Sequence, residues 1–260
     1  MSITVATWNV NSIKARLAPL LEWLRAARPD IVLLQELKCT TEAFPRAQVE
    51  DLGYHALVCG QKGWNGVAIL SRFAIDPIVD RLPGDEQDAQ ARYVEGFTGG
   101  LRVAALYAPN GNPVGSDKFA YKLRWLERLR RHAAELLEGD DAVVLGGDYN
   151  VIPEPIDCYD PEAWRDDALF HPESRRAFRA LVYLGLYDAF RALHPDEPKA
   201  YTFWDYQGRA FQLDHGIRID HLLLSPQALD RLERVAIDRA PRARAHASDH
   251  TPLVAAFTEG

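Results

Sequence analysis

Short apolar segments recur along the whole sequence, and each is bounded by turn-forming or polar residues. Such segments are typical of β-strands. The length of 260 residues admits one large domain or two modest ones. Because neither a linker nor a repeat interrupts the series, we expect a single domain over residues 1–260. The predicted strands are Ile3–Trp8, Ile31–Gln35, Gly66–Ser71, Tyr93–Phe97, Leu101–Tyr107, Ala142–Leu145, Ile219–Leu224 and Leu253–Phe257, with a hairpin turn at Thr98-Gly99-Gly100.

Three other segments carry apolar residues at helical spacing. Ser12 is expected to cap one helix, which runs to Leu24, and Asp117 to cap a second, which runs to Leu129. A third is predicted from Pro172, at the first helical position after His171, through Leu184. Because strands and helices do not alternate strictly, we expect antiparallel or mixed sheets with helices outside them.

The composition excludes several classes of protein. A hydrophobic fraction of 47% with 26% charged residues is ordinary for a folded domain. No apolar run reaches about 18 residues, so we expect no membrane span. The N-terminal residues do not have the pattern of a secretory signal. Cys39, Cys59 and Cys158 are too few for a disulfide framework and lack zinc-site spacing, so we expect reduced thiols in a cytoplasmic protein.

Charge is unevenly distributed along the chain, whose net charge is -7. Residues 118–131, beginning with Lys118, hold six basic residues and one acid, whereas residues 154–167 hold six acids and one arginine. The basic segment is most simply the solvated face of a helix. The alternative is a surface that follows phosphates on an otherwise acidic protein.

Polar residues stand where the apolar segments end. Taken singly, each has an ordinary explanation, because aspartate after Gly-Gly favours turns and glutamate at a strand end is often a solvated charge. Their repetition in one chain indicates that they converge at one edge of a sandwich. The residues are Asn9, Asn11, Glu36, Tyr107, Asn110, Asp148, Asn150, Asp220, Asp249 and His250.

Hydrolysis of a phosphate ester is the chemistry that suits this set. Glu36, Asp148 and Asp249 form an oxygen-rich group with the asparagine amides, which favours Mg²⁺, or Mn²⁺ as a substitute, over zinc. His250 is suited to contact a phosphoryl oxygen while Asp220 orients its other ring nitrogen. No GxxxxGKS, GxGxxG or GxSxG motif is present, so nothing supports a nucleotide-driven motor, a dehydrogenase or a serine hydrolase.

An ordered series of sequence blocks resembles the exonuclease III family of apurinic/apyrimidinic (AP) endonucleases, within the larger endonuclease/exonuclease/phosphatase superfamily. GDYN alone is a weak signal, but the ordered set is highly specific. The resemblance implies an α+β fold, a four-layer αββα sandwich of two packed mixed β-sheets flanked by helices, with the site at one sheet edge. The blocks are WNVNS (8–12), QELK (35–38), GVAILSR (66–72), LYAPNG (106–111), YKLRWLERL (121–129), GDYN (147–150), TFWDY (202–206), RIDHLLLS (218–225) and SDHTP (248–252).

The resemblance also implies a role for each matching residue. Glu36 corresponds to the principal metal-binding carboxylate, with Asn9 and Asn11 nearby. Asp148 corresponds to the residue that orients or deprotonates the attacking water, and Asn150 to its positioning partner and a metal contact. The other implied roles are phosphate contact by His250 held by Asp220, a second metal or water ligand at Asp249, and retention of the scissile phosphate by Tyr107 and Asn110.

The substrate is suggested by apolar residues in the C-terminal third. Phe203, Trp204, Ile217 and Ile219 match the family's pocket for a flipped-out sugar without its base, which costs least to extrude. Ordinary core packing is the alternative for the two aromatic residues. Many relatives carry tryptophan where this chain has Ile217, so the pocket's selectivity is expected to differ.

Residues 207–217 match a segment that inserts into the DNA groove in relatives. Gln207 is expected to act as a modest wedge, and Arg209 as a phosphate or groove contact. Lys62, Lys118 and Arg244 are the other basic residues expected to hold duplex DNA.

The sequence thus predicts a Mg²⁺-dependent DNA-repair phosphodiesterase, acting as a monomer on duplex DNA. It would incise 5′ to AP sites, trim nucleotides or blocking groups from 3′ ends, or both. One alternative is mainly a 3′-exonuclease or 3′-phosphatase with weak AP-site activity. Others are a related enzyme for inositol phosphates or sphingomyelin, a secreted nonspecific DNase, or a binding module without catalysis. The last should lack Glu36, Asp148, Asn150 or His250, and all four are present.

Overall fold

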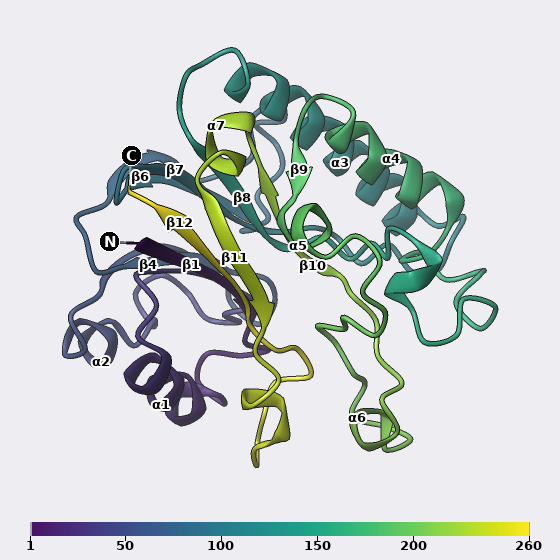
Figure 1. Ribbon diagram of the computed structural model, residues 1–260, viewed down its shortest axis with the longest axis horizontal. Helices are drawn as coiled ribbons and strands as arrows, with labels where there is room; N and C mark the ends of the chain where they lie inside the picture. The colour runs from purple at the N-terminus through teal and green to yellow at the C-terminus, as the bar shows by residue number, and fades with distance from the viewer. Residues whose placement is uncertain (1, 260) are drawn as a thin grey trace.

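Two six-stranded β-sheets pack face to face in the computed structural model, which describes residues 2–259. Helices cover the outer face of each sheet, so the predicted four-layer αββα sandwich is confirmed (Figure 1). The first sheet consists, from edge to edge, of β11 (Leu232–Ile237), β12 (Leu253–Thr258), β1 (Ser2–Asn9), β2 (Ile31–Gln35), β4 (Val67–Ser71) and β3 (His55–Cys59).

The second sheet has the same mixed character as the first. In each sheet one central pair of strands is parallel and the other pairs are antiparallel. The carboxyl ends of each parallel pair therefore lie at the same sheet edge. From edge to edge, the second sheet consists of β5 (Asp76–Val79), β6 (Tyr93–Thr98), β7 (Leu101–Tyr107), β8 (Val143–Asp148), β10 (Asp220–Leu224) and β9 (Tyr187–Asp188).

The longer helices lie on opposite sides of the sandwich (Figure 1). Helices α1 (Leu17–Ala27) and α2 (Arg46–Glu50) pack against the first sheet, and α3 (Asp117–Leu136) and α4 (Pro172–Val182) against the second. Within residues 2–259, no helix is long and apolar enough to cross a membrane. The remaining helices are α5 (Ala189–Leu193), α6 (Ala210–Leu213) and α7 (Pro226–Leu229), with 3₁₀ turns at Pro155–Asp157 and Pro241–Ala243.

The central strands are buried on both faces. Leu33 of β2 lies in the core between the sheets, whereas its neighbour Leu34 lies in the core beneath α1. Val5 and Ala6 of β1 divide in the same way. Because successive side chains point to opposite faces, burial on both faces requires an unbroken apolar run. This is why these strands were recognisable from the sequence.

Strand β8 is longer than the predicted segment, which ended at Leu145. It continues through Gly146 and Gly147 because both residues face close neighbours. A Cβ on Gly147 would lie 1.8 Å from the carbonyl oxygen of Leu106, and a Cβ on Gly146 would lie 2.4 Å from Cδ1 of Leu33. The two glycines thus let β8 run between its neighbours and place Asp148 at its end.

The predicted helix cap at Ser12 is wrong. Helix α1 begins at Leu17, and Arg16 is the residue before it. The main-chain N–H of Ser12 donates to the carbonyl of Glu36 at 2.7 Å, so this segment is tied to the connection after β2.

The other two predicted helix starts are closer to the structure. Ser116, not Asp117, caps α3, and its side chain accepts a hydrogen bond from the N–H of Phe119. Helix α4 begins at Pro172 after His171, as predicted, but ends at Val182. Strands β3, β5, β9 and β11 were not predicted, and each forms an outer edge of a sheet.

Candidate active site

Both sheets contribute to one cluster of polar residues. Asn9 ends β1 and Asp148 ends β8. Tyr107 and Asp148 are register partners on the parallel strands β7 and β8, and Asp220 is the antiparallel partner of Asp148 on β10. Carboxyl ends of parallel strands and the start of an antiparallel neighbour thus meet at one edge of the sandwich, as the sequence predicted.

Glu36 stands directly after β2, where the chain has a positive φ of 53°. Its carboxylate accepts a hydrogen bond from Asn9 Nδ2 at 2.8 Å, and the same amide donates to Asp148 at 2.9 Å. Lys38 lies 2.9 Å from the other carboxylate oxygen of Glu36. Burial alone would raise the pKa of Glu36, but hydrogen bonds from Asn9 and Lys38 hold it below its ordinary value. Glu36 is therefore an anion at neutral pH.

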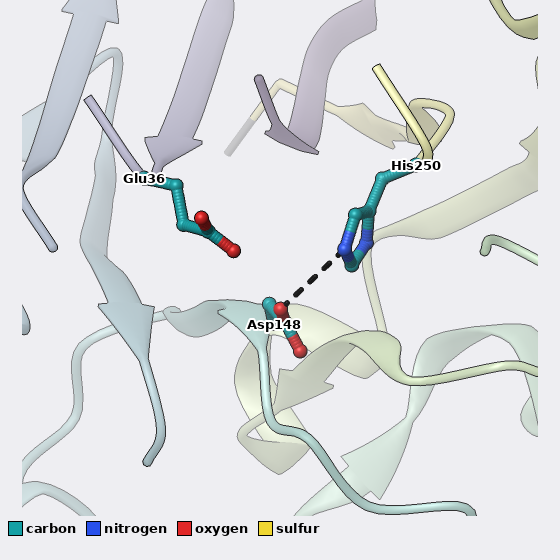
Figure 2. A group of neighbouring side chains, drawn as sticks. All are labelled: Glu36, Asp148 and His250. Atoms are coloured by element: carbon teal, nitrogen blue, oxygen red, sulfur yellow. Dashed lines mark ion pairs between the residues drawn. The ribbon is translucent and has the colours of Figure 1, made fainter. Parts of the chain in front are cut away.

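His250 lies between two aspartates that occupy neighbouring strands. Its Nδ1 is 2.8 Å from Asp220, and its Nε2 is 3.7 Å from Asp148. Figure 2 shows the ring and the Glu36 carboxylate directed toward Asp148 from two sides. Burial alone would lower the pKa of His250, but the neighbouring carboxylates, Asp220 foremost, raise it to about 10. The imidazole is therefore a cation held in a fixed orientation.

Asp148 is fully buried and accepts hydrogen bonds on both oxygens. Its Oδ1 accepts from the N–H of Asn150 at 2.8 Å, and its Oδ2 accepts from Asn9. Burial raises the pKa of Asp148 to about 7, with a further increase from nearby carboxylates and an opposing effect of His250. A carboxylate with this pKa is suited to accept a proton near neutral pH.

Two amides and a phenol complete the polar cluster. The Asn110 amide lies 3.3 Å from the side-chain oxygen of Asn150, whose own amide donates to the carbonyl of Ala108 at 2.9 Å. Burial, with a further effect of the nearby carboxylates, raises the pKa of Tyr107 well above its ordinary value. Tyr107 therefore remains a hydrogen-bond donor.

Asn11 and Asp249 form a second polar group beside the first. The Asn11 amide donates to Asp249 at 3.0 Å, and its oxygen accepts from Lys38 at 2.6 Å. Arg16 holds this segment because it donates to the carbonyl of Asn11 at 2.7 Å and to the hydroxyl of Tyr206 at 2.9 Å. The structure thus connects Asn11 to the segment that carries Gln207 and Arg209.

The donor set fits a divalent cation. Carboxylate oxygens of Glu36 and Asp148 lie within 4.8 Å of each other and of a ring nitrogen of His250, whose protonated imidazole is not itself a ligand (Figure 2). Two of the three are carboxylates, the type of ligand that Mg²⁺ and Mn²⁺ prefer. Asp249 lies outside this group.

A small apolar cluster adjoins the polar residues. Phe203 forms isolated β-bridges with both His250 and Ile217, and its ring centroid is 5.0 Å from that of His250. Trp164 and Phe203 pack against the cluster from its edge. The apolar cluster consists of Ile152, Cys158, Leu169, Phe170, Ile217 and Ile219.

Trp204 does not belong to this apolar cluster, although the sequence grouped it with Phe203. It is fully buried with Tyr201 and Ala210, and its indole N–H donates to Asp214 at 3.2 Å. Adjacent residues of an extended chain point to opposite sides, which separates Trp204 from Phe203. Trp204 supports the base of the loop that carries Gln207 and Arg209.

The residues predicted to hold DNA differ in their surroundings. Lys62, Lys118, Gln207 and Arg209 are exposed. Arg244 is also exposed but pairs with Glu22 at 2.5 Å.

The basic segment 118–131 is not a uniform solvated face. Lys122 is buried, and Arg128 binds the carbonyls of Leu82 and Pro83 and the carboxylate of Asp88. Arg130 and Arg131 both pair with Glu127. Much of the positive charge of this segment is therefore paired with groups of the protein itself.

Several residues at or near the site were missed by the sequence reasoning. Lys38 belongs to the QELK block and pairs with Glu36, so its position in that block was an available signal. Arg218 belongs to the RIDHLLLS block but is fully buried, with ion pairs of 2.7 Å to Asp157 and to Asp188. Asp157 gave no such signal, because it lies in an acidic stretch that looked solvated.

Comparisons with known proteins agree with this geometry. The profile of the Endonuclease/Exonuclease/phosphatase family matches residues 6–250. The chain is 33% identical to exodeoxyribonuclease III of Haemophilus influenzae, over 96% of this chain and 98% of that protein. An AP endonuclease structure from Archaeoglobus fulgidus has a TM-score of 0.94 and 38% identity, covering 98% of this chain and 99% of the other.

A third similar protein is a variant of the 3′ phosphatase NExo from Neisseria, solved with a product DNA hairpin. It has a TM-score of 0.96 and 38% identity, and covers 98% of this chain and 99% of its own. The fold and the site define a phosphodiester hydrolase. The chain belongs to the endonuclease/exonuclease/phosphatase family, and within it to the exonuclease III type of nuclease, as the ordered sequence blocks predicted.

Proposed function

We propose that this protein hydrolyses phosphodiesters in duplex DNA, 5′ to AP sites and at blocked or ordinary 3′ ends. One observation carries the proposal: Phe203 bridges His250 and the apolar cluster that contains Ile217. A phosphate bound at His250 therefore has an apolar wall beside it. Such a wall suits a deoxyribose that has lost its base, or the sugar at a 3′ end.

In the proposed reaction, Asp148 positions the attacking water and accepts its proton. The water oxygen forms a bond to phosphorus while the bond between phosphorus and the departing sugar oxygen breaks. His250, held by Asp220, donates a hydrogen bond from Nε2 to a phosphoryl oxygen. Nε2 of His250 lies 3.7 Å from Asp148. A water held by Asp148 and a phosphoryl group held by His250 can therefore lie next to each other.

The neighbouring residues orient the phosphate. Tyr107 donates from its phenol, and Asn110 from its amide, to the charge that develops on the phosphoryl group. Asn150 keeps Asp148 in place through its main-chain N–H.

Glu36, with Asn9 and Asp148 beside it, would hold the Mg²⁺ ion, and Mn²⁺ is the expected substitute. When bound, the ion supplies polarisation of a phosphoryl oxygen and neutralises developing negative charge. Asp249, held by Asn11, is proposed as a second ligand to metal or water.

DNA contact is proposed for the exposed residues around the site, Gln207, Arg209, Lys62 and Lys118. We also propose that residues 1–260 act as one domain and as a monomer in the cytoplasm. Because Ile217 is smaller than the tryptophan that many relatives carry, its wall holds a baseless sugar less firmly. This observation favours a second candidate function, in which 3′-end removal dominates and incision at AP sites is weak.

The test is a cleavage assay on a 5′-labelled duplex with one central AP analogue, beside duplexes with recessed and phosphate-blocked 3′ ends. Each substrate is incubated with Mg²⁺, with EDTA, and with the Asp148→Asn variant. Incision 5′ to the lesion, absent in both controls, is the expected result. Trimming of 3′ ends with an intact AP strand would instead support the second candidate.

No turnover of any DNA would overturn the proposal. In that case an inositol phosphate and sphingomyelin are the next substrates, because they retain the same phosphate-ester chemistry. A protein that binds DNA without cleaving any of these esters would be the binding module considered from the sequence.

A further inference from the structure

Lys122 is fully buried on α3, although the sequence placed it in a basic helix segment. Its Nζ donates to three main-chain carbonyls: Asn110 at 3.1 Å, Asn150 at 2.6 Å and Ala168 at 3.0 Å. An ammonium carries three N–H donors, so these bonds use all of them. A buried amine without hydrogen-bond partners costs free energy, and here the three carbonyls supply those partners.

The three carbonyls belong to three separate segments of the site. Asn110 follows β7, and Asn150 follows β8. Ala168 precedes Leu169, whose carbonyl accepts from the N–H of Ile152 at 2.8 Å. Leu169 and Ile152 both belong to the apolar cluster. Lys122 thus joins the two amide-bearing loops to the apolar wall.

Asn150 has a left-handed backbone, with φ of 50°. Asparagine adopts this conformation more readily than most residues other than glycine, and hydrogen bonds on both sides hold it here. Its N–H is held by Asp148 and its carbonyl by Lys122. The chain also crosses the lysine closely at Gly111, where a Cβ would lie 2.6 Å from Cδ of Lys122.

We propose that Lys122 is a positioning residue of the site, which fixes the main chain of Asn110 and Asn150 so that their amides and Asp148 face the same phosphate. This inference rests on the proposed function, because it deepens the same site. Lys122 acts through these residues and does not touch the substrate. When the three N–H donors of Lys122 are removed, the main chain of Asn150 relaxes. A displacement of about 1 Å in a catalytic group can cost on the order of 10²-fold in rate.

The first experiment compares full-length Lys122→Met, Lys122→Arg and wild type. A matched control is His132→Leu, because His132 is buried on the same helix but binds Glu95, at 2.7 Å, away from the three carbonyls. The measurements are kcat and KM on the AP-site duplex and on the duplex with a 3′-phosphate, with a thermal melt of each variant.

Lys122→Met is expected to lose roughly 10²-fold in kcat on whichever of the two DNAs the wild type cleaves, with KM changed much less. Lys122→Arg should restore part of the loss, because it retains N–H donors. His132→Leu should melt at a lower temperature and keep its kcat. A Lys122→Met variant that only melts lower, like the control, would overturn the proposal.

The second experiment is a double-mutant cycle with Asn150→Ala. If Lys122 acts partly through Asn150, the loss in the double variant should be clearly smaller than the product of the two single losses. Losses that multiply would show independent action and overturn the inference. If Lys122→Met does not fold, Lys122→Gln, which keeps two donors, replaces it, and the same outcomes decide. A wild type that cleaves neither DNA would contradict the proposed function instead.

Discussion

Asp220 and Asp148 lie directly opposite each other on the antiparallel strands β10 and β8. His250 contacts the first through Nδ1 and faces the second through Nε2. The pairing register of two strands therefore places the two aspartates on either side of the imidazole.

Asp220→Asn should show whether Asp220 keeps the imidazole of His250 protonated. The substitution removes the negative charge that most raises the pKa of His250, so this pKa falls from about 10 toward its ordinary value of about 6.5. The imidazole of the variant then loses its proton as the pH rises through neutrality, whereas that of the wild type keeps it. We expect kcat/KM of the variant to decline above about pH 6.5. A pH–rate profile from pH 5.5 to 9 measures this.

Asp141→Asn is the control, because Asp141 is exposed and pairs only weakly with Arg102, at 3.5 Å. Parallel pH–rate profiles for the wild type and Asp220→Asn would contradict the assignment of the proton to His250.

Ile217→Ala should distinguish the two candidate substrates. Removing this buried side chain from the apolar cluster is expected to destabilise the fold by about 2–5 kcal/mol and to weaken incision at an AP site. Removal of a 3′-phosphate should change less if it depends mainly on the polar residues. The ratio of the two activities, measured on folded protein, is the relevant quantity.

A suitable control for Ile217→Ala is Ile69→Ala, which removes the same atoms from the core between the sheets. It should lower stability without changing the ratio of activities. An equal loss of both activities in Ile217→Ala would mean that this wall does not select the lesion.

Gly147→Ala should prevent folding. The added Cβ would lie 1.8 Å from a backbone oxygen of the neighbouring strand, and backbone cannot move aside as a flexible side chain can. Circular dichroism and the yield of soluble protein report the outcome. Gly139→Ala has 3.6 Å of clearance and should change stability by no more than about 0.5 kcal/mol. A Gly147→Ala protein with normal stability would contradict the close packing of β8 against β7.

His221 should make stability depend on pH. Its Nδ1 lies 3.0 Å from the buried Arg218, and burial, followed by this positive charge, lowers the pKa of His221 to about 4. Between pH 4 and 6.5 the unfolded chain therefore binds a proton that the folded chain excludes. The contribution of His221 to the free energy of unfolding should therefore fall as the pH drops through this range, by roughly 3 kcal/mol at most, while the raised pKa of Asp148 acts in the opposite direction.

Urea unfolding at a series of pH values tests this linkage. His221→Gln should gain stability relative to the wild type as the pH falls through this range, whereas His55→Gln, at an exposed position, should not. A difference in stability between the wild type and His221→Gln that stays constant between pH 4 and 6.5 would contradict the prediction.

The sequence predicted the central strands better than the edges of the sheets. Strands such as β2 are buried on both faces and are apolar up to the last residue, Gln35. The edge strands β3, β5, β9 and β11 are partly exposed, and apart from the short apolar run of β3 their polar and apolar side chains are mixed. Edge strands of this kind are hard to recognise, because their pairing depends on a neighbour distant in the sequence.

The candidate site was also predicted unevenly. Glu36, Asp148 and Asp220 were found because each is an acid next to a buried strand. Lys122 and Arg218 were missed, since a charged residue in a polar stretch looks solvated and only the fold shows that it is buried. Trp204 was assigned to the wrong side of its segment because two adjacent aromatic residues do not reveal which one faces the site.

Because the polar cluster is divided between the two sheets, an activity measurement also tests how the two sheets are aligned. Asn9 and Glu36 come from the first sheet, and Tyr107, Asp148 and Asp220 from the second. Neither sheet alone carries all of the residues of the proposed site. Turnover therefore depends on the alignment of the two sheets. A shift of one sheet relative to the other would abolish activity while nearly all secondary structure persisted.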